Sequence, residues 1–268
     1  MNVPATVDYF MEDAREADRL EQKVNPQAWV KKYLERYLRP ELEVLSVGCG
    51  PGNILRAIAE AEPTIHATGI DISHTRIEQA RKRSAGNSQV KFFCGNATEM
   101  QFPRRTFDLV YTRMLLQYLS QKEKAVSEMV RVTKPGGMVL LQDLDGQLIW
   151  HYPEDPIMQN AVMQVTGALA ESGFDPHVGR KLFWLAQKAG LEQIEVQAEP
   201  YHLIAGEIDP LISQQWKLKL DIAKPSMVRA LGSEKEADEQ VRRFMDYLSR
   251  PDTLTYSIVF TIAGKKPL

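Results

Sequence analysis

Between residues 44 and 145, short apolar runs alternate with stretches in which apolar residues recur every three or four positions. The apolar runs predict strands at 44–48, 65–71, 90–96, 107–113 and 136–145. The amphipathic stretches predict helices at 52–62, 73–86 and 120–133. Ser73 and Ser120 stand where helix N-caps are typical. Strands that alternate with helices form parallel sheets covered by helices on both faces, so the pattern predicts an α/β fold.

After residue 145 the alternation is interrupted twice. A helix is predicted at 178–191, and strands are predicted at 192–203 and 254–264. The segment 205–250 has a helical pattern, with a break near AKPSM (223–227) and an N-cap at Ser233. We expect a helical segment covering the site, a sheet core, a cap insertion, a core continuation, a helical cap insertion and a final strand, at 1–40, 41–145, 146–177, 178–204, 205–250 and 251–268.

Composition and charge narrow the class of protein. The 268 residues carry 33 Lys and Arg against 35 Asp and Glu, a net charge of -2, so no global basic field favours nucleic acid or an anionic membrane. Cys49 and Cys94 cannot build a disulfide framework, which favours a reducing, cytoplasmic setting. The acidic N-terminus does not fit a signal peptide, and no apolar run approaches the ~20 residues of a membrane span. We expect a monomer or homodimer without a metal ion, a nucleic-acid partner or a membrane span.

The segment VLSVGCGPGNIL (44–55) places Gly48, Gly50 and Gly52 between the first strand and the first helix, where open α/β sheets bind ligands. No Gly-Lys pair follows, so the segment is not a P-loop. The third glycine comes one residue too early for the dinucleotide fingerprint G-x-G-x-x-G. Asp71 closes the second strand, where a carboxylate can accept from ribose hydroxyls or can cap the helix that follows.

Three later segments complete a recognisable order: CGNATEM (94–100), FDLVYTRMLLQYL (107–119) and VTKPGGMVLLQD (132–143). With the glycine segment, they resemble the class I S-adenosylmethionine (SAM)-dependent methyltransferases over roughly residues 15–145 and, more loosely, 178–200. EADRLEQK (16–23) resembles an N-terminal helix of the subgroup that acts on small molecules. The resemblance implies a Rossmann-like fold with a mostly parallel seven-stranded sheet, helices on both faces and helical caps.

The same resemblance implies that SAM donates a methyl group to an O, N or C atom of a small metabolite and leaves as S-adenosylhomocysteine. The aromatic and Met-rich caps favour an apolar or aromatic acceptor. The family's cofactor positions correspond here to Arg19, Gly48, Cys49, Gly50, Gly52, Asp71, Ile72, Asn96, Ala97 and Arg113. The chain departs from the family at Asn96 and at Ser46, where acidic residues are usual.

A hydroxyl acceptor would need a general base, whereas an amine or an activated carbon can react without one. Asp143 and Asp145 end the fifth strand beside the expected cofactor site, and His151 follows in an aromatic-rich segment. Each could instead be structural. The residues leave open a SAM-binding protein without methyl transfer, such as a cyclase or sensor, an RNA or protein methyltransferase, and a nicotinamide oxidoreductase. Five aromatic residues are candidates for an acceptor pocket: Trp150, Phe174, Trp184, Tyr201 and Trp216.

Overall fold

A seven-stranded sheet organises the computed structural model, which describes residues 15, 19–21 and 24–268. The strands are β1 (Glu43–Val47), β2 (His66–Asp71), β3 (Val90–Cys94), β4 (Phe107–Arg113), β5 (Thr133–Tyr152), β6 (Glu192–Ala205) and β7 (Leu254–Lys265). Their order is β3-β2-β1-β4-β5-β7-β6. Only β7 runs against its neighbours, β5 and β6, which confirms the prediction of a mostly parallel sheet.

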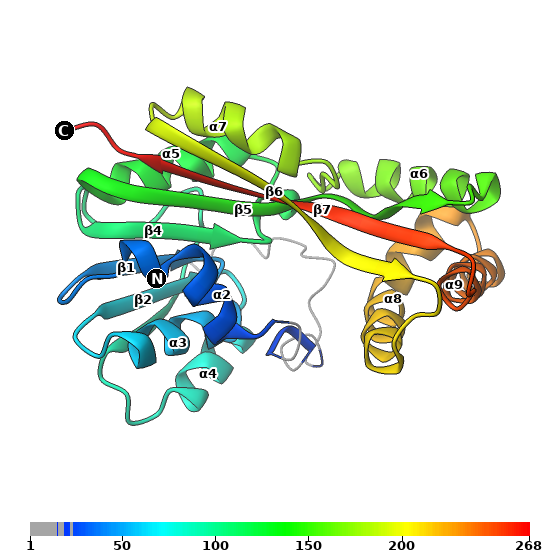
Figure 1. Cartoon of the computed structure of the whole chain (residues 1–268), viewed down its shortest axis with the longest axis horizontal. Coiled ribbons are helices and arrows are strands. Elements are labelled where there is room, and N and C mark those ends of the chain that lie inside the picture. Colours follow the sequence, from blue (N-terminus) through cyan, green and yellow to red (C-terminus); the bar gives the residue numbers. More distant parts are fainter. Residues whose placement is uncertain (1–14, 16–18, 22–23) are drawn as a thin grey trace.

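Helices cover both faces of the sheet (Figure 1). On one face lie α2 (Pro26–Tyr33), α3 (Asn53–Ala61) and α4 (His74–Arg83), and on the other lie α5 (Lys122–Val132) and α7 (Leu182–Lys188). Strand β1 shows why both are needed, because Val44 packs into the first core and Leu45 and Val47 pack into the second. Short 3-10 helices lie at η1 (Glu35–Tyr37), η2 (Leu116–Tyr118) and η3 (Gly179–Lys181). Part of the predicted N-terminal segment, residues 1–14, 16–18, 22 and 23, lies outside the described residues.

Strands β5, β6 and β7 extend beyond the rest of the sheet and carry a helical cap (Figure 1). The cap consists of α6 (Pro156–Ala170), α8 (Pro210–Leu231) and α9 (Glu234–Leu248). Strand β5 continues to Tyr152, because after a register shift beyond Asp145 it pairs with β7 again from Trp150 onward. The prediction that the fifth strand ends at residue 145 is therefore wrong. In the described part of the chain, no helix combines the length and apolarity needed to cross a bilayer.

Helix ends test the capping predictions. Ser73 Oγ accepts from the N–H of Arg76 at 3.3 Å, so the predicted N-cap of α4 is confirmed. Ser233 also caps α9 as predicted, through the N–H of Glu236 at 3.1 Å. The prediction for Ser120 is wrong, because α5 starts one residue later than a cap at this position allows and has no side-chain cap bond.

Helix α8 also differs from the sequence prediction, because it continues through Pro225 where a break was expected. A proline inside a helix removes one backbone hydrogen bond and costs about 3 kcal/mol. In the structure α8 packs along both α6 and α9, and this tertiary burial outweighs the local preference.

Candidate functional site

The loop between β1 and α3 turns through three glycines in left-handed conformations. The φ angles are 72° at Gly48, 54° at Gly50 and 80° at Gly52, a region that residues with a Cβ rarely adopt. The amide of Gly48 donates to the carbonyl of Ile70 at 2.8 Å, which fixes the loop against the end of β2. A Cβ on Gly52 would lie 2.5 Å from the ring of Phe92. The loop therefore needs glycine for two reasons: the left-handed backbone at all three positions, and the close packing against Phe92 at Gly52.

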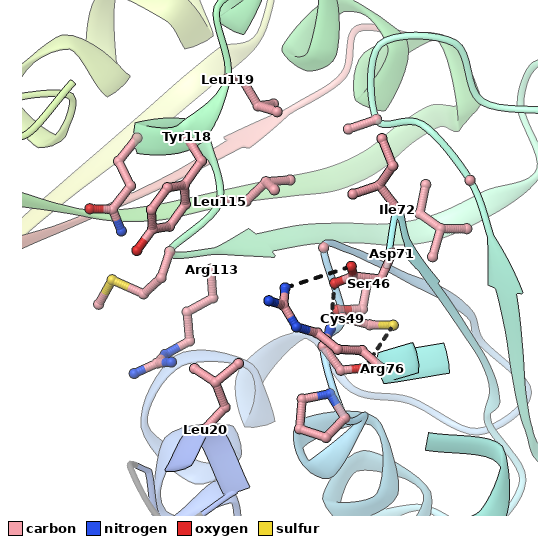
Figure 2. Close-up of a pocket in the computed structure, with 18 of the residues that line it drawn as sticks. Leu20, Ser46, Cys49, Asp71, Ile72, Arg76, Arg113, Leu115, Tyr118 and Leu119 are labelled. Atoms are coloured by element: carbon pink, nitrogen blue, oxygen red, sulfur yellow. Dashed lines mark hydrogen bonds and ion pairs between the residues drawn. The ribbon is translucent and has the colours of Figure 1, made fainter. Parts of the chain in front are cut away.

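A pocket of about 240 Å³ opens beside this loop at the carboxyl edge of the parallel strands (Figure 2). Its walls come from the glycine loop, the ends of β2 and β4, the loop after β3, η2 and the N-terminal turn at residues 19–20. Nine of the predicted cofactor residues line it: Arg19, Gly48, Cys49, Gly50, Asp71, Ile72, Asn96, Ala97 and Arg113. Gly52 does not line the pocket. It caps α3 instead.

Asp71 projects into this pocket from the end of β2 (Figure 2). Its Oδ2 accepts from the N–H of Gly50 at 2.9 Å, and its Oδ1 accepts from the N–H of Ser73 at 3.0 Å. The guanidinium of Arg76 lies 3.9 Å from Oδ1, and both side chains are almost fully buried. A carboxylate has about four acceptor positions, so about two remain for hydroxyl donors of a ligand. Asp71 thus shapes the turn into α4 and can still bind a diol.

Asn96 and Ala97 line the pocket from the loop after β3. The Asn96 Oδ1 accepts from both the N–H and the Oγ1–H of Thr98, each at 2.9 Å. Both lone pairs of that oxygen are therefore used within the loop, so the Asn96 side chain has no free acceptor for an adenine amino group. The backbone of Ala97 is left as the candidate contact for a base.

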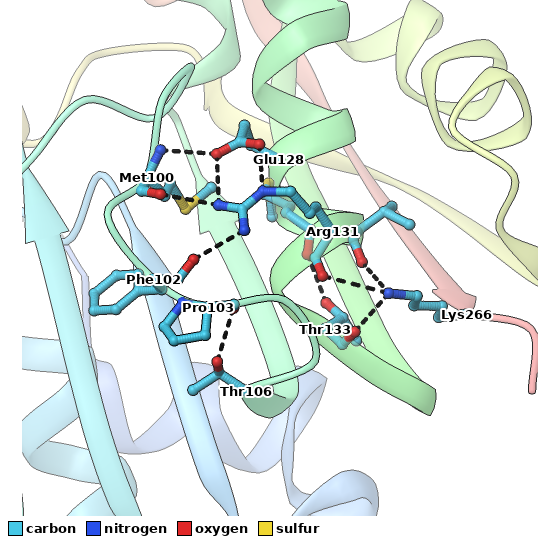
Figure 3. A network of polar contacts seen from close by, with 10 residues as sticks. Met100, Phe102, Pro103, Thr106, Glu128, Arg131, Thr133 and Lys266 are labelled. Atoms are coloured by element: carbon cyan, nitrogen blue, oxygen red, sulfur yellow. Dashed lines mark hydrogen bonds and ion pairs between the residues drawn. The ribbon is translucent and has the colours of Figure 1, made fainter.

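This loop is held from behind by an ion pair on α5 (Figure 3). Glu128 Oε2 accepts from the N–H of Met100 at 2.8 Å, and Arg131 Nη2 and Nη1 donate to the carbonyls of Met100 and Phe102, both at 2.9 Å. Arg131 also binds Glu128 directly, with Nε 2.6 Å from Oε1. The side-chain hydrogen bond from Arg131 holds the pKa of Glu128 below its usual value. The pair therefore fixes the segment that presents Ala97 to the pocket.

Three arginines line the pocket; Arg76 lies beside Asp71, and the other two give the pocket a positive region. Arg113 leaves the end of β4, and its Nη2 donates to the hydroxyl of Tyr201 at 3.1 Å. Its Nε is buried and has no hydrogen-bond partner among the described residues. Arg19, also buried, lines the pocket from the N-terminal turn, which an ion pair between Glu21 and Arg56 ties to α3. A guanidinium with an unused buried donor suits a carboxylate ligand.

The structure brings none of the predicted catalytic residues into the pocket. Asp143 is fully buried behind η2, where Oδ2 accepts from the N–H of Gln117 at 3.1 Å and Oδ1 from the N–H of Leu144 at 2.9 Å. Burial raises the pKa of Asp143 to about 7, although these amides and the nearby Arg113 oppose the rise. Asp143 therefore holds the loop after β4 and does not line the pocket.

Asp145 and His151 lie farther along β5 and also do not line the pocket. The Asp145 carboxylate accepts two hydrogen bonds from Arg180, at 2.8 and 2.7 Å, which ties β5 to η3. In the cap, His151 Nδ1 lies 3.1 Å from Thr255 Oγ1, and its ring packs 5.1 Å from that of Tyr247. Burial lowers the pKa of His151 to about 4. Among the described lining residues, Asp71 is the only carboxylate and no histidine is present.

The pocket also contains residues that the sequence reasoning missed. Tyr118 of η2 lies on the same side of the pocket as Arg113 in Figure 2, and Ile72 lies opposite. The segment MLLQYL directly follows β4, so its position at the carboxyl edge was a usable signal for Tyr118. Arg76 was identifiable in the first turn of the helix after Asp71.

Comparison of the sequence with known proteins finds similarity to methyltransferases. Residues 44–137 match the family model described as a methyltransferase domain. An uncharacterised methyltransferase of Schizosaccharomyces pombe is 28% identical over 158 residues, covering 56% of each chain. The demethylmenaquinone methyltransferase of Staphylococcus aureus is 32% identical over 136 residues, covering 49% of this chain and 56% of that one.

A solved structure extends the likeness to the fold. The phosphoethanolamine N-methyltransferase 2 of Haemonchus contortus, in complex with SAM, has a TM-score of 0.64 at 16% identity and covers 100% of this chain and 60% of that chain. At this identity the match shows the fold alone. The chain spans about half the length of the curated relatives it matches, with 44% and 56% of two of them covered.

Proposed function

We propose that this chain, which belongs to the class I SAM-dependent methyltransferase family, binds SAM in the pocket beside the glycine loop and methylates a small molecule. One observation carries this proposal. The backbone of Gly48 and Gly50 and the carboxylate of Asp71 form adjacent walls of one pocket at the carboxyl edge of the sheet. SAM has no phosphate, so a loop that lacks both the P-loop lysine and the pyrophosphate spacing suits it.

The lining residues divide into two groups that suit the two ends of SAM. At one end, Asp71 has acceptor positions left for the ribose hydroxyls, and such charge-assisted bonds contribute about 1.5–3 kcal/mol each. Ile72 and Ala97 line the same pocket. With the ribose on Asp71, Ile72 can pack on the face of the adenine and the Ala97 N–H can bind its edge. At the other end, the buried Arg19 and the Nε–H of Arg113, which has no partner among the described residues, suit the methionine carboxylate.

When bound, SAM supplies a methyl group already activated by its sulfonium. The chain's contribution is to hold the acceptor atom in line with that group, which can lower a barrier by about 7–11 kcal/mol. Since Asp71 is the only acid and no histidine lines the pocket among the described residues, we propose an acceptor that needs no strong base. An amine nitrogen or an activated carbon meets this requirement better than an alcohol.

Isothermal titration calorimetry with SAM, S-adenosylhomocysteine and NAD⁺ tests the binding step. We expect heat with the first two ligands and none with NAD⁺. Asp71→Ala should weaken SAM affinity by at least about tenfold, the loss expected from one charge-assisted hydrogen bond. Asp145→Asn is the matched control, since Asp145 is an equally buried aspartate within β5 but lies outside the pocket. Unchanged affinity in Asp71→Ala, or tighter binding of NAD⁺, would contradict the proposal.

A second candidate function is a SAM-binding protein that transfers no methyl group. The lack of a general base among the described lining residues favours this second function too, because a protein that only binds SAM needs no base. Incubation of the protein with SAM and a fractionated metabolite extract separates the two. Formation of S-adenosylhomocysteine supports methyl transfer, whereas intact SAM together with measured SAM affinity supports the second function.

A further inference from the structure

A second cavity, of about 150 Å³, lies between α6, α8 and α9 of the helical cap and is partly open to solvent. Its walls are almost entirely apolar and include Met158 and Ala161 from α6, Trp216 and Leu220 from α8, and Phe244 from α9. In another protein, an engineered apolar cavity of about 150 Å³ stays dry and takes up benzene. The cap cavity therefore has room for one aromatic ring or a branched alkyl group.

Tyr118 joins this cavity to the candidate cofactor pocket, because its side chain forms part of both walls. The Tyr118 ring lies 5.6 Å from the ring of Phe174, which also lines the cap cavity. Helix η2, which carries Tyr118, is fixed by the hydrogen bond from the Gln117 amide to Asp143. A group in the cap cavity would thus be one side chain away from the pocket proposed for SAM.

Gln240, a residue that lines the cavity, has one side-chain acceptor without a hydrogen-bond partner among the described residues. Gln240 is buried with 8% of its surface exposed, and its Nε2 donates to Glu236 Oε1 at 2.8 Å. Its Oε1 is buried without a hydrogen-bond partner among the described residues. A buried acceptor left unpaired is unfavourable, and native proteins rarely keep one. A ligand with a hydroxyl or N–H group would satisfy it.

We propose that the cap cavity binds the non-reacting part of the methyl acceptor. That part is an apolar body of about one ring with a hydrogen-bond donor that pairs with Gln240, and the nucleophilic atom projects past Tyr118 into the cofactor pocket. The assignment of this ligand as the methyl acceptor rests on the proposed function. Of the predicted aromatic residues, Phe174 and Trp216 line the cavity, whereas Trp150 and Trp184 are exposed at the surface.

The test uses ethylbenzene and 4-ethylphenol, which differ only by a donor group, as calorimetric probes of protein with and without saturating S-adenosylhomocysteine. We expect both probes to bind the wild-type protein. Ala161→Trp and Ala223→Phe fill the cavity from α6 and α8 respectively, and each should weaken both probes by at least tenfold. Met163→Trp is the matched control on α6, because Met163 is 71% exposed and does not line the cavity, and it should change nothing. Melting curves of each variant verify the fold.

Gln240→Leu tests the donor. It should lower the ratio of 4-ethylphenol affinity to ethylbenzene affinity by roughly tenfold, as expected when one hydrogen bond to a buried group is lost. An unchanged ratio overturns the assignment of the donor. Absence of probe binding, or binding that both cavity-filling variants leave intact, overturns the cavity as a ligand site. S-adenosylhomocysteine that fails to bind while the probes still bind overturns the proposed function and the acceptor assignment, but not the cavity.

Discussion

Asp143→Asn tests how a fully buried carboxyl supports the loop after β4. Burial raises the pKa of Asp143 from its usual 3.8 to about 7, a difference of about 3 pH units. Since one pKa unit corresponds to about 1.4 kcal/mol, the titration of this group changes the free energy of unfolding by about 4 kcal/mol. Asparagine does not titrate, so this contribution disappears in the variant.

The sign of the pH dependence of the free energy of unfolding follows from whether the folded or the unfolded chain holds the proton on Asp143. Between pH about 4 and about 7 the folded protein keeps a proton on Asp143 that the unfolded chain has already released. The free energy of unfolding therefore decreases as the pH rises through this window, and the stability from the protonated carboxyl is complete only below pH about 4. Asparagine has one acceptor oxygen, so the variant also loses one of the two amide hydrogen bonds, a pH-independent cost of about 1–3 kcal/mol.

Urea unfolding of both proteins at pH 4, 5, 6 and 7, followed by circular dichroism, measures the difference directly. We expect the wild type to be more stable than Asp143→Asn at pH 4, and this advantage to shrink by about 4 kcal/mol by pH 7. A difference that stays constant over the series would refute the reasoning. Because Asp143 lies outside the pocket, formation of S-adenosylhomocysteine should persist in the folded variant, and a hundredfold loss would contradict its structural role.

Two further predictions concern residues that support the pocket from outside its wall. Gly52→Ala should lower the free energy of unfolding by about 2–4 kcal/mol, because the new Cβ would lie 2.5 Å from the Phe92 ring at a φ of 80°. Gly86→Ala, with a φ of 86° but open space around it, should cost only about 1 kcal/mol in the same urea assay, and equal losses would contradict the packing argument. Arg131→Met should speed amide hydrogen exchange in residues 95–106 and weaken SAM affinity several-fold, because that segment loses two charge-assisted hydrogen bonds. Unchanged exchange would show that the segment is held by other contacts.

Local chemistry explains why much of the fold and of the pocket was predictable. The run FDLVYTR matches β4 residue for residue, because its apolar residues serve both cores: Leu109 and Tyr111 pack on one face of the sheet, and Phe107 and Val110 pack on the other. Gly48 and Gly50 need left-handed backbone, and their spacing after a strand predicted the ligand loop. Asp71 closes β2 and lines the same pocket, because parallel strands end at one edge.

The errors come from contacts between distant segments. Whether Asp143 faces a ligand or a loop depends on where η2 packs, and the residues of β5 alone do not determine this. Strand β5 continues past Asp145 because β7, more than 100 residues later in the chain, supplies a pairing edge. Pro225 stays helical because α8 packs against both α6 and α9.

The sequence by itself determined the parallel sheet, the glycine turn and the carboxylate beside it, since each depends on the conformational preferences of residues close together in the chain. Only the tertiary structure decided which acids are buried as supports, that the Nε–H of Arg113 is left without a partner among the described residues, and that three cap helices line an apolar cavity next to Tyr118. Cavities and buried hydrogen bonds depend on how segments far apart in the chain pack together. A pattern of neighbouring residues does not determine which distant segments come into contact.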